Sequence, residues 1–277
     1  MAEECTHDCS TCSANCSSRQ PESLLAAPHE KSHIGKVIGV VSGKGGVGKS
    51  MVTSLLAVML ARKGLRTAVL DADITGPSIP KVFGVKGDVT GDETGINPLV
   101  SSCGTKIMSV NLLLDNETTP VIWRGPVIAG TVKQFWTDVM WGDVDVMLVD
   151  CPPGTGDVPL TVFQSIPLSG VVIVTSPQEL VSMIVGKAAN MAKMMNIPVL
   201  GVVENMSYVA CPDCGKQIEV FGPSRLAAVC EEYGFAPLGR MPLDPTLASL
   251  CDAGSIELAQ SEEMAKAADQ VASALGL

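Results

Sequence analysis

The chain has 277 residues, of which 46% are hydrophobic and 17% are charged, and its formal net charge is −10. This apolar content is enough for one large core and excludes disorder along the whole chain. The acidic balance disfavours binding to nucleic acid or to anionic membranes, both of which attract basic surfaces. No apolar run reaches the ~18–20 residues that cross a bilayer, and the N-terminus lacks the basic and apolar segments of a signal peptide. We therefore expect a cytoplasmic protein with no membrane partner and no nucleic-acid partner.

Composition divides the chain into three parts. Residues 1–20 form a cysteine-rich tail, residues 21–35 form a linker with two prolines, and residues 36–277 form a single domain. Within that domain, short apolar runs predict strands at 36–42, 66–71, 143–150, 170–176, 197–204 and 237–242. Helical segments are expected up to about Lys63 and near 126–140, 179–195, 224–233 and 257–275. This alternation predicts an α/β fold, with a mainly parallel sheet flanked by helices on both faces. Segment 96–114 is either a β-hairpin insertion or an added edge strand.

A phosphate-binding loop follows the first predicted strand. Residues 43–50 read GKGGVGKS, match the pattern G-x-x-x-x-G-K-[ST] and open a helix. Glycines let backbone N–H groups curl around phosphate oxygens, and the new helix directs its positive end at the anion. Lys49 is expected to reach the β- and γ-phosphates and Ser50 to ligate Mg²⁺, unless the loop is a tight turn without a ligand. The nucleotide-binding residues of this loop are Gly43, Lys44, Gly45, Gly46, Val47, Gly48, Lys49 and Ser50.

Acidic residues follow two other predicted strands. Asp150 ends the apolar run VMLVD, where a carboxylate can hold the water shell of Mg²⁺. Residues 151–157 (CPPGTGD) form a stiff, glycine-bearing switch loop, whose Asp157 either links the loop to another site or caps a helix. Asp71 or Asp73, in the segment DADITGPSIP, can face the nucleotide, although Asp, Gly and Pro are turn residues in any protein. Three separate segments thus fit one nucleotide site.

Ten cysteines are unusual for a reducing compartment, where clustered cysteines indicate metal binding or catalysis more often than disulfides. Cys5, Cys9, Cys12 and Cys16 have the spacing C-x₃-C-x₂-C-x₃-C, and four thiolates are enough for a [4Fe–4S] cluster or for tetrahedral zinc. On a helix, at ~100° per residue, all four would share one face, so metal binding must bend or replace such a helix. The spacing itself does not decide between iron and zinc.

Cys211 and Cys214 form a second pair, CPDC, after the predicted strand 197–204. A four-ligand site needs two more ligands, and a second copy of the pair across a two-fold axis would supply them. The pair therefore predicts a metal-bridged homodimer, with iron or zinc as the metal. A redox pair or a turn with incidental thiols is the alternative. The remaining cysteines occur singly and are by default expected to be buried and to pack as small hydrophobic residues. They are Cys103, Cys151, Cys230 and Cys251.

Lys44 is a second lysine in the loop and makes it the deviant Walker A sequence K-G-G-x-G-K-[ST]. In this feature the chain resembles the MinD/ParA/nitrogenase-reductase class of P-loop ATPases. The resemblance implies that Lys44 crosses a dimer interface to the partner's nucleotide, and that it acts in catalysis together with Lys49 and Asp73. By the same resemblance, Asp73 lies in the segment that positions the attacking water. Asn205 and Pro242, which follow predicted strand ends, would contact the base.

Six segments, in this order, closely resemble the Mrp/ApbC-type iron–sulfur cluster carriers: GKGGVGKS, DADITGPSIP, WRGP, DCPPGTGD, ENMSYVACPDC and MPLDP. The resemblance implies a dimeric ATPase, using ATP and Mg²⁺, that assembles a [4Fe–4S] cluster on paired CPDC motifs. It also implies partners, which are cluster donors and the apoproteins that receive the cluster. The tail resembles the ferredoxin-like N-terminal extension of the cytosolic cluster scaffolds of this family, because both have clustered cysteines. It lacks their long first gap between cysteines.

Two other functions remain alternatives to a cluster carrier. A MinD/ParA-type positioning or partition ATPase would share the nucleotide site but has no use for CPDC. Membrane positioning needs a basic amphipathic helix at the end of the chain, whereas segment 255–277 has one lysine and four carboxylate residues. A zinc-stabilised nucleotide sensor would use the same cysteines without iron.

Overall fold

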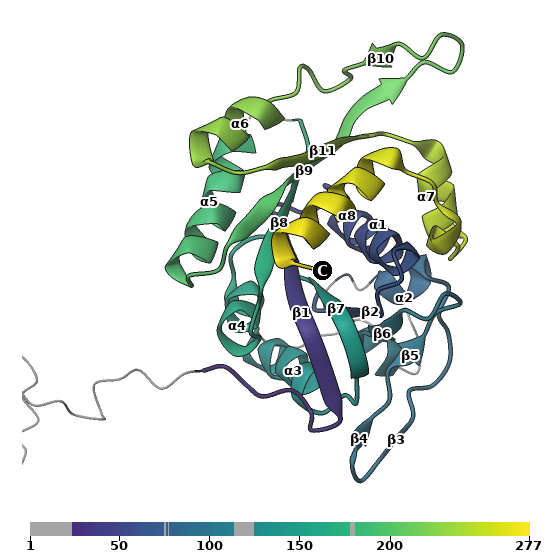
Figure 1. Cartoon of the computed structure of the whole chain (residues 1–277), viewed down its shortest axis with the longest axis vertical. Coiled ribbons are helices and arrows are strands. Elements are labelled where there is room, and N and C mark those ends of the chain that lie inside the picture. Colours follow the sequence, from purple (N-terminus) through teal and green to yellow (C-terminus); the bar gives the residue numbers. More distant parts are fainter. Residues whose placement is uncertain (1–23, 75, 77, 114–124, 178–180) are drawn as a thin grey trace, which may run out of the picture.

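The structure is a computed structural model, and it describes residues 24–74, 76, 78–113, 125–177 and 181–277. The predicted metal-binding tail, with Cys5, Cys9, Cys12 and Cys16, lies outside the described residues. Within the described part, one sheet has the strand order β10-β9-β8-β1-β7-β2-β6-β5, and β11 pairs with β9. Helices cover both faces of this sheet (Figure 1). The predicted α/β architecture is thereby confirmed.

Most neighbouring strands of the sheet pair in parallel, as the buried apolar runs predict. The parallel strands are β1 (Ser32–Val41), β2 (Thr67–Asp71), β6 (Lys106–Met108), β7 (Gly142–Asp150), β8 (Gly170–Thr175), β9 (Val199–Ala210) and β11 (Pro237–Pro242). Such strands end at one common edge, so the loops that follow β1, β2 and β7 meet there.

The edges of the sheet contain the short antiparallel strands. β6 pairs with β2, and β5 (Leu99–Val100) returns antiparallel to β6, so segment 96–114 adds edge strands to the sheet. β3 (Gly91–Asp92) and β4 (Gly95–Ile96) form a separate hairpin. At the other edge, β10 (Gln217–Ile218) pairs with the end of β9 and closes a second hairpin. β9 thus extends six residues past the predicted limit at 204, because its last residues pair with β10 and β11.

Two apolar cores lie on the two sides of the sheet. One is covered by α3 (Gly125–Thr137), α4 (Asp157–Ser165), α5 (Val181–Met194) and α6 (Leu226–Tyr233). The other is covered by α1 (Lys49–Arg62), α2 (Ile79–Val82), α7 (Pro245–Asp252) and α8 (Glu262–Leu275). α1 is apolar on almost every side because it lies between the sheet and α8 (Figure 1).

Three helices are absent from the sequence prediction, namely α2, α4 and α7. All three are short, and each has a proline within or at the start of the helix, which hides the helical period. α7 nevertheless carries a local start signal, since the Asp244 carboxylate caps it by accepting from Thr246 N at 2.7 Å. The predicted start of the last helix at residue 257 is wrong. The chain makes a 3₁₀ turn at Ile256–Leu258, and α8 begins after the Ser261 cap.

Residues before the predicted start of β1 also pack on the body. β1 begins at Ser32, because its first residues pair with the start of β7. Further upstream, Ala26 N donates to Ser165 O at 2.8 Å, and the Trp136 indole donates to Ala26 O at 2.9 Å. The chain therefore meets the body at the ends of α3 and α4.

None of the helices described here combines the length and the apolar content needed to cross a membrane.

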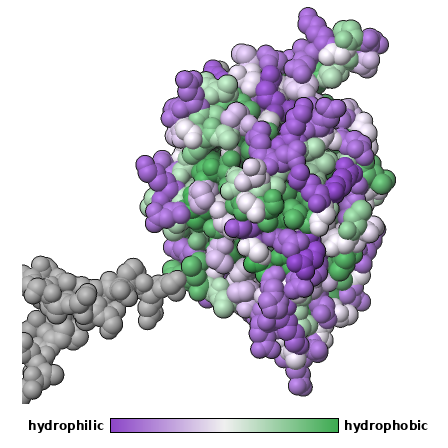
Figure 2. Space-filling view, viewed as in Figure 1, coloured by the Kyte–Doolittle hydropathy of each residue, from purple (hydrophilic) through white to green (hydrophobic). Residues whose placement is uncertain are grey.

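The space-filling view shows a mainly hydrophilic β3–β4 projection, whereas the β9–β10 projection carries hydrophobic residues as well (Figure 2). The latter are Ile218, Val220 and Phe221, with 49%, 58% and 47% of their surface exposed.

Candidate functional site

The glycine-rich loop leaves β1 at the common strand edge and leads into α1. Gly48 caps the helix with φ 75°, a left-handed conformation that favours glycine, and a Cβ there would lie 2.2 Å from Asn205 Nδ2. A Cβ on Gly43 would lie 2.1 Å from the side chain of Ile184 in α5. The loop therefore needs glycine at these two positions for steric reasons. It borders a cavity of about 220 Å³ lined by Ser42, Gly45, Gly46, Val47, Gly48, Lys49, Ser50, Met51, Asp73 and Pro153.

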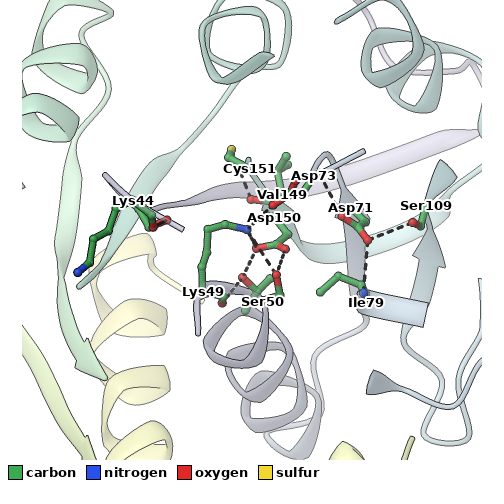
Figure 3. A network of polar contacts seen from close by, with 12 residues as sticks. Lys44, Lys49, Ser50, Asp71, Asp73, Ile79, Ser109, Val149, Asp150 and Cys151 are labelled. Atoms are coloured by element: carbon green, nitrogen blue, oxygen red, sulfur yellow. Dashed lines mark hydrogen bonds and ion pairs between the residues drawn. The ribbon is translucent and has the colours of Figure 1, made fainter. Parts of the chain in front are cut away.

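Asp150 organises the floor of this cavity (Figure 3). Its carboxylate accepts from Lys49 Nζ at 2.6 Å, from Ser50 Oγ at 2.5 Å and from Thr53 Oγ1 at 2.8 Å. Burial lowers the pKa of Lys49, but the ion pair and hydrogen bond with Asp150 outweigh it, so the pKa is raised overall. Lys49 is therefore a fixed positive charge, held where β1 and β7 end.

Thr53 also belongs to this cluster, although it lies outside the loop motif and was not predicted. It lies one turn after Lys49 on α1, where its hydroxyl contacts both Lys49 O, at 3.0 Å, and Asp150. The spacing of four residues on one helix face is the signal that identifies it. Its hydroxyl fixes the same Asp150 oxygen that accepts from Lys49, which leaves the other oxygen to Ser50.

Asp71 and Asp73 have different environments. Asp71 is fully buried and accepts from Ser109 Oγ at 3.0 Å and from the backbone of Ile79 at 3.3 Å. Burial first, and then repulsion from Asp150, raise the pKa of Asp71 to about 8, so it is mostly neutral at pH 7. Asp73 instead lines the cavity, with its Oδ2 3.9 Å from Lys49 Nζ. The geometry therefore favours Asp73 as the carboxylate that faces a nucleotide.

The switch loop packs directly against the phosphate-binding loop. Gly154 N donates to Ser42 O at 2.7 Å, and Pro153 lines the cavity. Asp157 is the first residue of α4 and is exposed, where its charge favours the helix dipole, whereas the cap position is taken by Gly156. Cys151 is buried, and burial raises the pKa of its thiol to about 12, so it is a packing residue.

Lys44 points away from this cluster. Its ammonium group is directed away from Lys49 and Asp150, in contrast to the inward side chain of Lys49 (Figure 3). Only its backbone carbonyl is tied to the loop, where it accepts from Ser42 Oγ at 3.0 Å. Within one chain, Lys44 does not face the cavity.

Asn205 and Pro242 lie on neighbouring strands beside the loop. Asn205 is fully buried within β9, not after a strand end as predicted, and its Nδ2 donates to Val47 O at 2.9 Å. Its Oδ1 has no hydrogen-bond partner among the described residues. Pro242 ends β11, as expected, and pairs in register with Tyr208 of β9.

The Cys211–Cys214 turn joins β9 to β10. Cys211 N donates to Lys216 O at 2.9 Å, and Gly215, with φ 70°, donates back to Cys211 O at 2.9 Å. Hydrogen bonds from the backbone of Cys214, then from that of Asp213, and then from the Cys214 side chain lower the pKa of the Cys211 thiol. A thiol so held favours the thiolate, which is the metal-binding form.

One chain supplies only part of a metal site here. No group of three or more His, Cys, Asp or Glu side chains suited to a metal ion occurs in the described ranges. Among the single cysteines, Cys103 is exposed, so the prediction that it is buried is wrong, and Cys251 is only partly buried. Cys151 and Cys230 are buried as predicted.

The glycine-rich loop lies between β1 and α1, and its lysine and hydroxyl are held on a carboxylate at the end of a parallel strand. This arrangement defines a P-loop nucleoside triphosphatase. Comparison with known families agrees, since residues 33–276 match the ParA model, described as NUBPL iron-transfer P-loop NTPase. The chain belongs to this family, and it is an ATPase of the P-loop class.

Relatives with assigned names are similar over nearly the whole chain. The iron-sulfur cluster carrier protein of Methanocaldococcus jannaschii is 45% identical, covering 91% of this chain and 89% of its own length. The protein of that name from Clostridium perfringens is 44% identical, covering 90% of each chain. Among solved structures, an Archaeoglobus fulgidus nucleotide-binding protein in complex with ADP and with Co has a TM-score of 0.76 at 43% identity, covering 83% of this chain and 90% of its own. The Aquifex aeolicus cell division protein MinD, at 18% identity and a TM-score of 0.59 over 86% of this chain and 97% of its own, shares the fold.

Proposed function

We propose that this protein is an ATP-dependent iron–sulfur cluster carrier, which binds a [4Fe–4S] cluster between two subunits and transfers it to apoproteins. The observation that carries the proposal is the Cys211–Cys214 turn, whose backbone N–H groups favour a thiolate on a hairpin next to a P-loop ATPase site. The relatives named as iron-sulfur cluster carrier proteins support the same cargo. In this function the cluster is the substrate, received from donor proteins and passed on.

The number of ligands supports a homodimer. Two thiolates from each chain complete a four-ligand cage across a two-fold axis. Ile218, Val220 and Phe221 follow the cysteine pair and are about half exposed, which suits burial against a second copy. In such a dimer the outward Lys44 can reach the partner's nucleotide, which agrees with its direction away from its own cavity.

The nucleotide site divides its work among the loop, α1 and β7. Lys49 binds the β- and γ-phosphates, and the loop N–H groups hold the remaining phosphate oxygens. The Ser50 hydroxyl and the Asp150 carboxylate are hard oxygen donors on adjacent elements, joined by a hydrogen bond, and Mg²⁺ would be held by the Ser50 hydroxyl with Asp150 on its water shell. When bound, Mg²⁺ neutralises charge on the phosphate oxygens. Asp73 orients the water that attacks the γ-phosphate.

Candidate contacts to the base lie on the paired strands β9 and β11. The Asn205 amide offers an acceptor, Oδ1, to the exocyclic amino group of adenine, which guanine lacks at that position of the ring. Pro242 supplies an apolar contact at the end of β11.

We also propose that Cys5, Cys9, Cys12 and Cys16 of the tail bind a second metal or cluster.

Quantification of iron, sulfide and zinc per chain, after anaerobic reconstitution, tests the proposal. In protein lacking residues 1–20, we expect about four irons and four sulfides for each two chains, and loss of both when Cys211→Ala and Cys214→Ala are made in that same shortened protein. The matched control is Cys103→Ala, which removes an exposed cysteine elsewhere in the chain. Full iron in the double variant, or full iron on a monomer, would contradict the proposal. Stoichiometric zinc in place of iron would favour the nucleotide-sensor alternative.

A further inference from the structure

β9 carries contacts to both candidate sites. Asn205 reaches the phosphate-binding loop through Val47 O, and Cys211 follows the end of the same strand. Between them the strand is irregular, because Met206 has φ 56°, a conformation that non-glycine residues rarely adopt. The pairing of β11 with β9 also shifts register between Arg240 and Pro242. Such irregular backbone tends to occur at functional sites.

Arg240 of β11 contacts residues of β9 on both sides of Met206. Its Nε donates to Ser207 Oγ at 2.7 Å, and Ser207 in turn donates to Glu204 Oε2 at 2.5 Å. The same Nε lies 3.7 Å from Glu204 Oε2. Its other nitrogen, Nη2, donates to Glu219 Oε1 at 2.7 Å, directly after β10. The guanidinium also lies over the Tyr208 ring, 5.6 Å from its centroid.

These bonds form a continuous path from the nucleotide loop to the cysteine turn. At one end Asn205, bound to Val47 O, is the chain neighbour of Glu204. At the other end Glu219 follows β10, whose neighbour Lys216 accepts from Cys211 N. Arg240 is the residue that joins the two ends, since its guanidinium has donors for both.

The path has unmet hydrogen-bonding capacity in its buried part. Glu204 Oε1 and Asn205 Oδ1 are buried, and neither has a hydrogen-bond partner among the described residues. A buried unpaired acceptor is unfavourable, so a small movement that pairs either oxygen gains free energy. The segment is thus suited to a second arrangement, which a link between distant sites requires.

We propose that Arg240 is a positioning residue, which couples occupancy of the phosphate-binding loop to the conformation of the Cys211–Cys214 turn. This inference rests on the proposed function, because it assigns to one residue the link between nucleotide and cargo. Phosphate at the loop moves Val47 O and with it Asn205. Glu204 and Ser207 follow as part of the same strand, and Arg240 carries the movement to Glu219 and the hairpin.

The alkylation rate of Cys211, with and without Mg-ADP, tests this link in the full-length, reduced, metal-free protein. Fragmentation of the peptide by tandem mass spectrometry assigns the label to Cys211 or to Cys214, which lie on the same peptide, and protein concentrations are used at which light scattering gives one assembly state throughout. In the wild type we expect ADP to change the rate by about fivefold, which corresponds to a coupling free energy of about 1 kcal/mol. In Arg240→Gln the ratio should fall to about one, while the dissociation constant for ADP and the iron bound per chain stay within about twofold.

Two further variants make the result specific. Glu219→Gln breaks the hairpin end of the path at a partly exposed side chain and should lower the same ratio, even if Arg240→Gln fails to fold. Arg66→Gln is the matched control, since Arg66 also binds two carboxylates, Asp143 and Asp145, and we expect it to keep the wild-type ratio. An unchanged ratio in both Arg240→Gln and Glu219→Gln, or no effect of ADP in the wild type, overturns the inference. If the wild type binds ADP and iron normally in that case, the proposed function stands without it.

Discussion

Gly48→Ala is the sharpest test of how the nucleotide loop is built. The new Cβ would lie 2.2 Å from Asn205 Nδ2, at a position whose φ of 75° is unfavourable for alanine. The left-handed conformation costs about 1–2 kcal/mol. Displacing Asn205 also removes its hydrogen bond to Val47 O, which is worth about 1 kcal/mol. We therefore expect the free energy of unfolding to fall by about 2–3 kcal/mol, as these two costs add.

Urea unfolding of the protein measures this change, and two variants separate its causes. Gly45→Ala is the control from the same loop, because its Cβ would meet only Pro153 Cγ at an ordinary 3.8 Å. Its free energy of unfolding should stay within about 0.5 kcal/mol of the wild type. In an Asn205→Ala background, Gly48→Ala should cost only the backbone part, about 1–2 kcal/mol. A Gly48→Ala protein as stable as Gly45→Ala would refute the reasoning.

Three other predictions concern single groups. Thr53→Val removes a hydroxyl donor to Asp150, and we expect a loss of about 1.5–3 kcal/mol in the free energy of unfolding, measured in urea. The pKa of Asp71 rises from 3.8 to about 8 on folding, so the stability that this shift contributes is fully present below about pH 4 and is lost as the pH rises towards 8. Asp71→Asn should therefore flatten the pH dependence of the free energy of unfolding in that window. An unchanged slope of that free energy against pH would contradict the prediction. The alkylation rate of Cys211 should reach its midpoint below pH 9 and that of Cys103 above it, because hydrogen bonds lower the first pKa while burial and Glu257 raise the second. Coincident midpoints, read by mass spectrometry, would argue against the turn geometry.

The nucleotide loop was predictable because its signal is local. Glycines at fixed spacing, a lysine and a hydroxyl residue between a strand and a helix require one backbone geometry, and the structure has it. The positions of the main strands and their parallel direction followed from apolar runs in the same way, whereas their order in the sheet did not. Asp150 was predictable as well, since it ends one of these runs.

Features that depend on tertiary packing were not predictable. The residues alone left Asp71 and Asp73 as alternatives and only the family resemblance favoured Asp73, whereas the burial of Asp71 beside Ser109 separates the two physically. Arg240 lies just before the MPLDP segment but outside it, and its partners come from β9 and from the segment after β10. The short helices α4 and α7 are stabilised mainly by packing, so local periodicity did not reveal them.

The Cys211–Ile218 hairpin projects beyond both cores, and almost all of its residues are exposed (Figure 1). Changes in its length or composition therefore leave the packing of the ATPase body untouched. Evolution can vary what such a protein carries by altering a few surface residues, while the machinery that consumes the nucleotide is inherited intact.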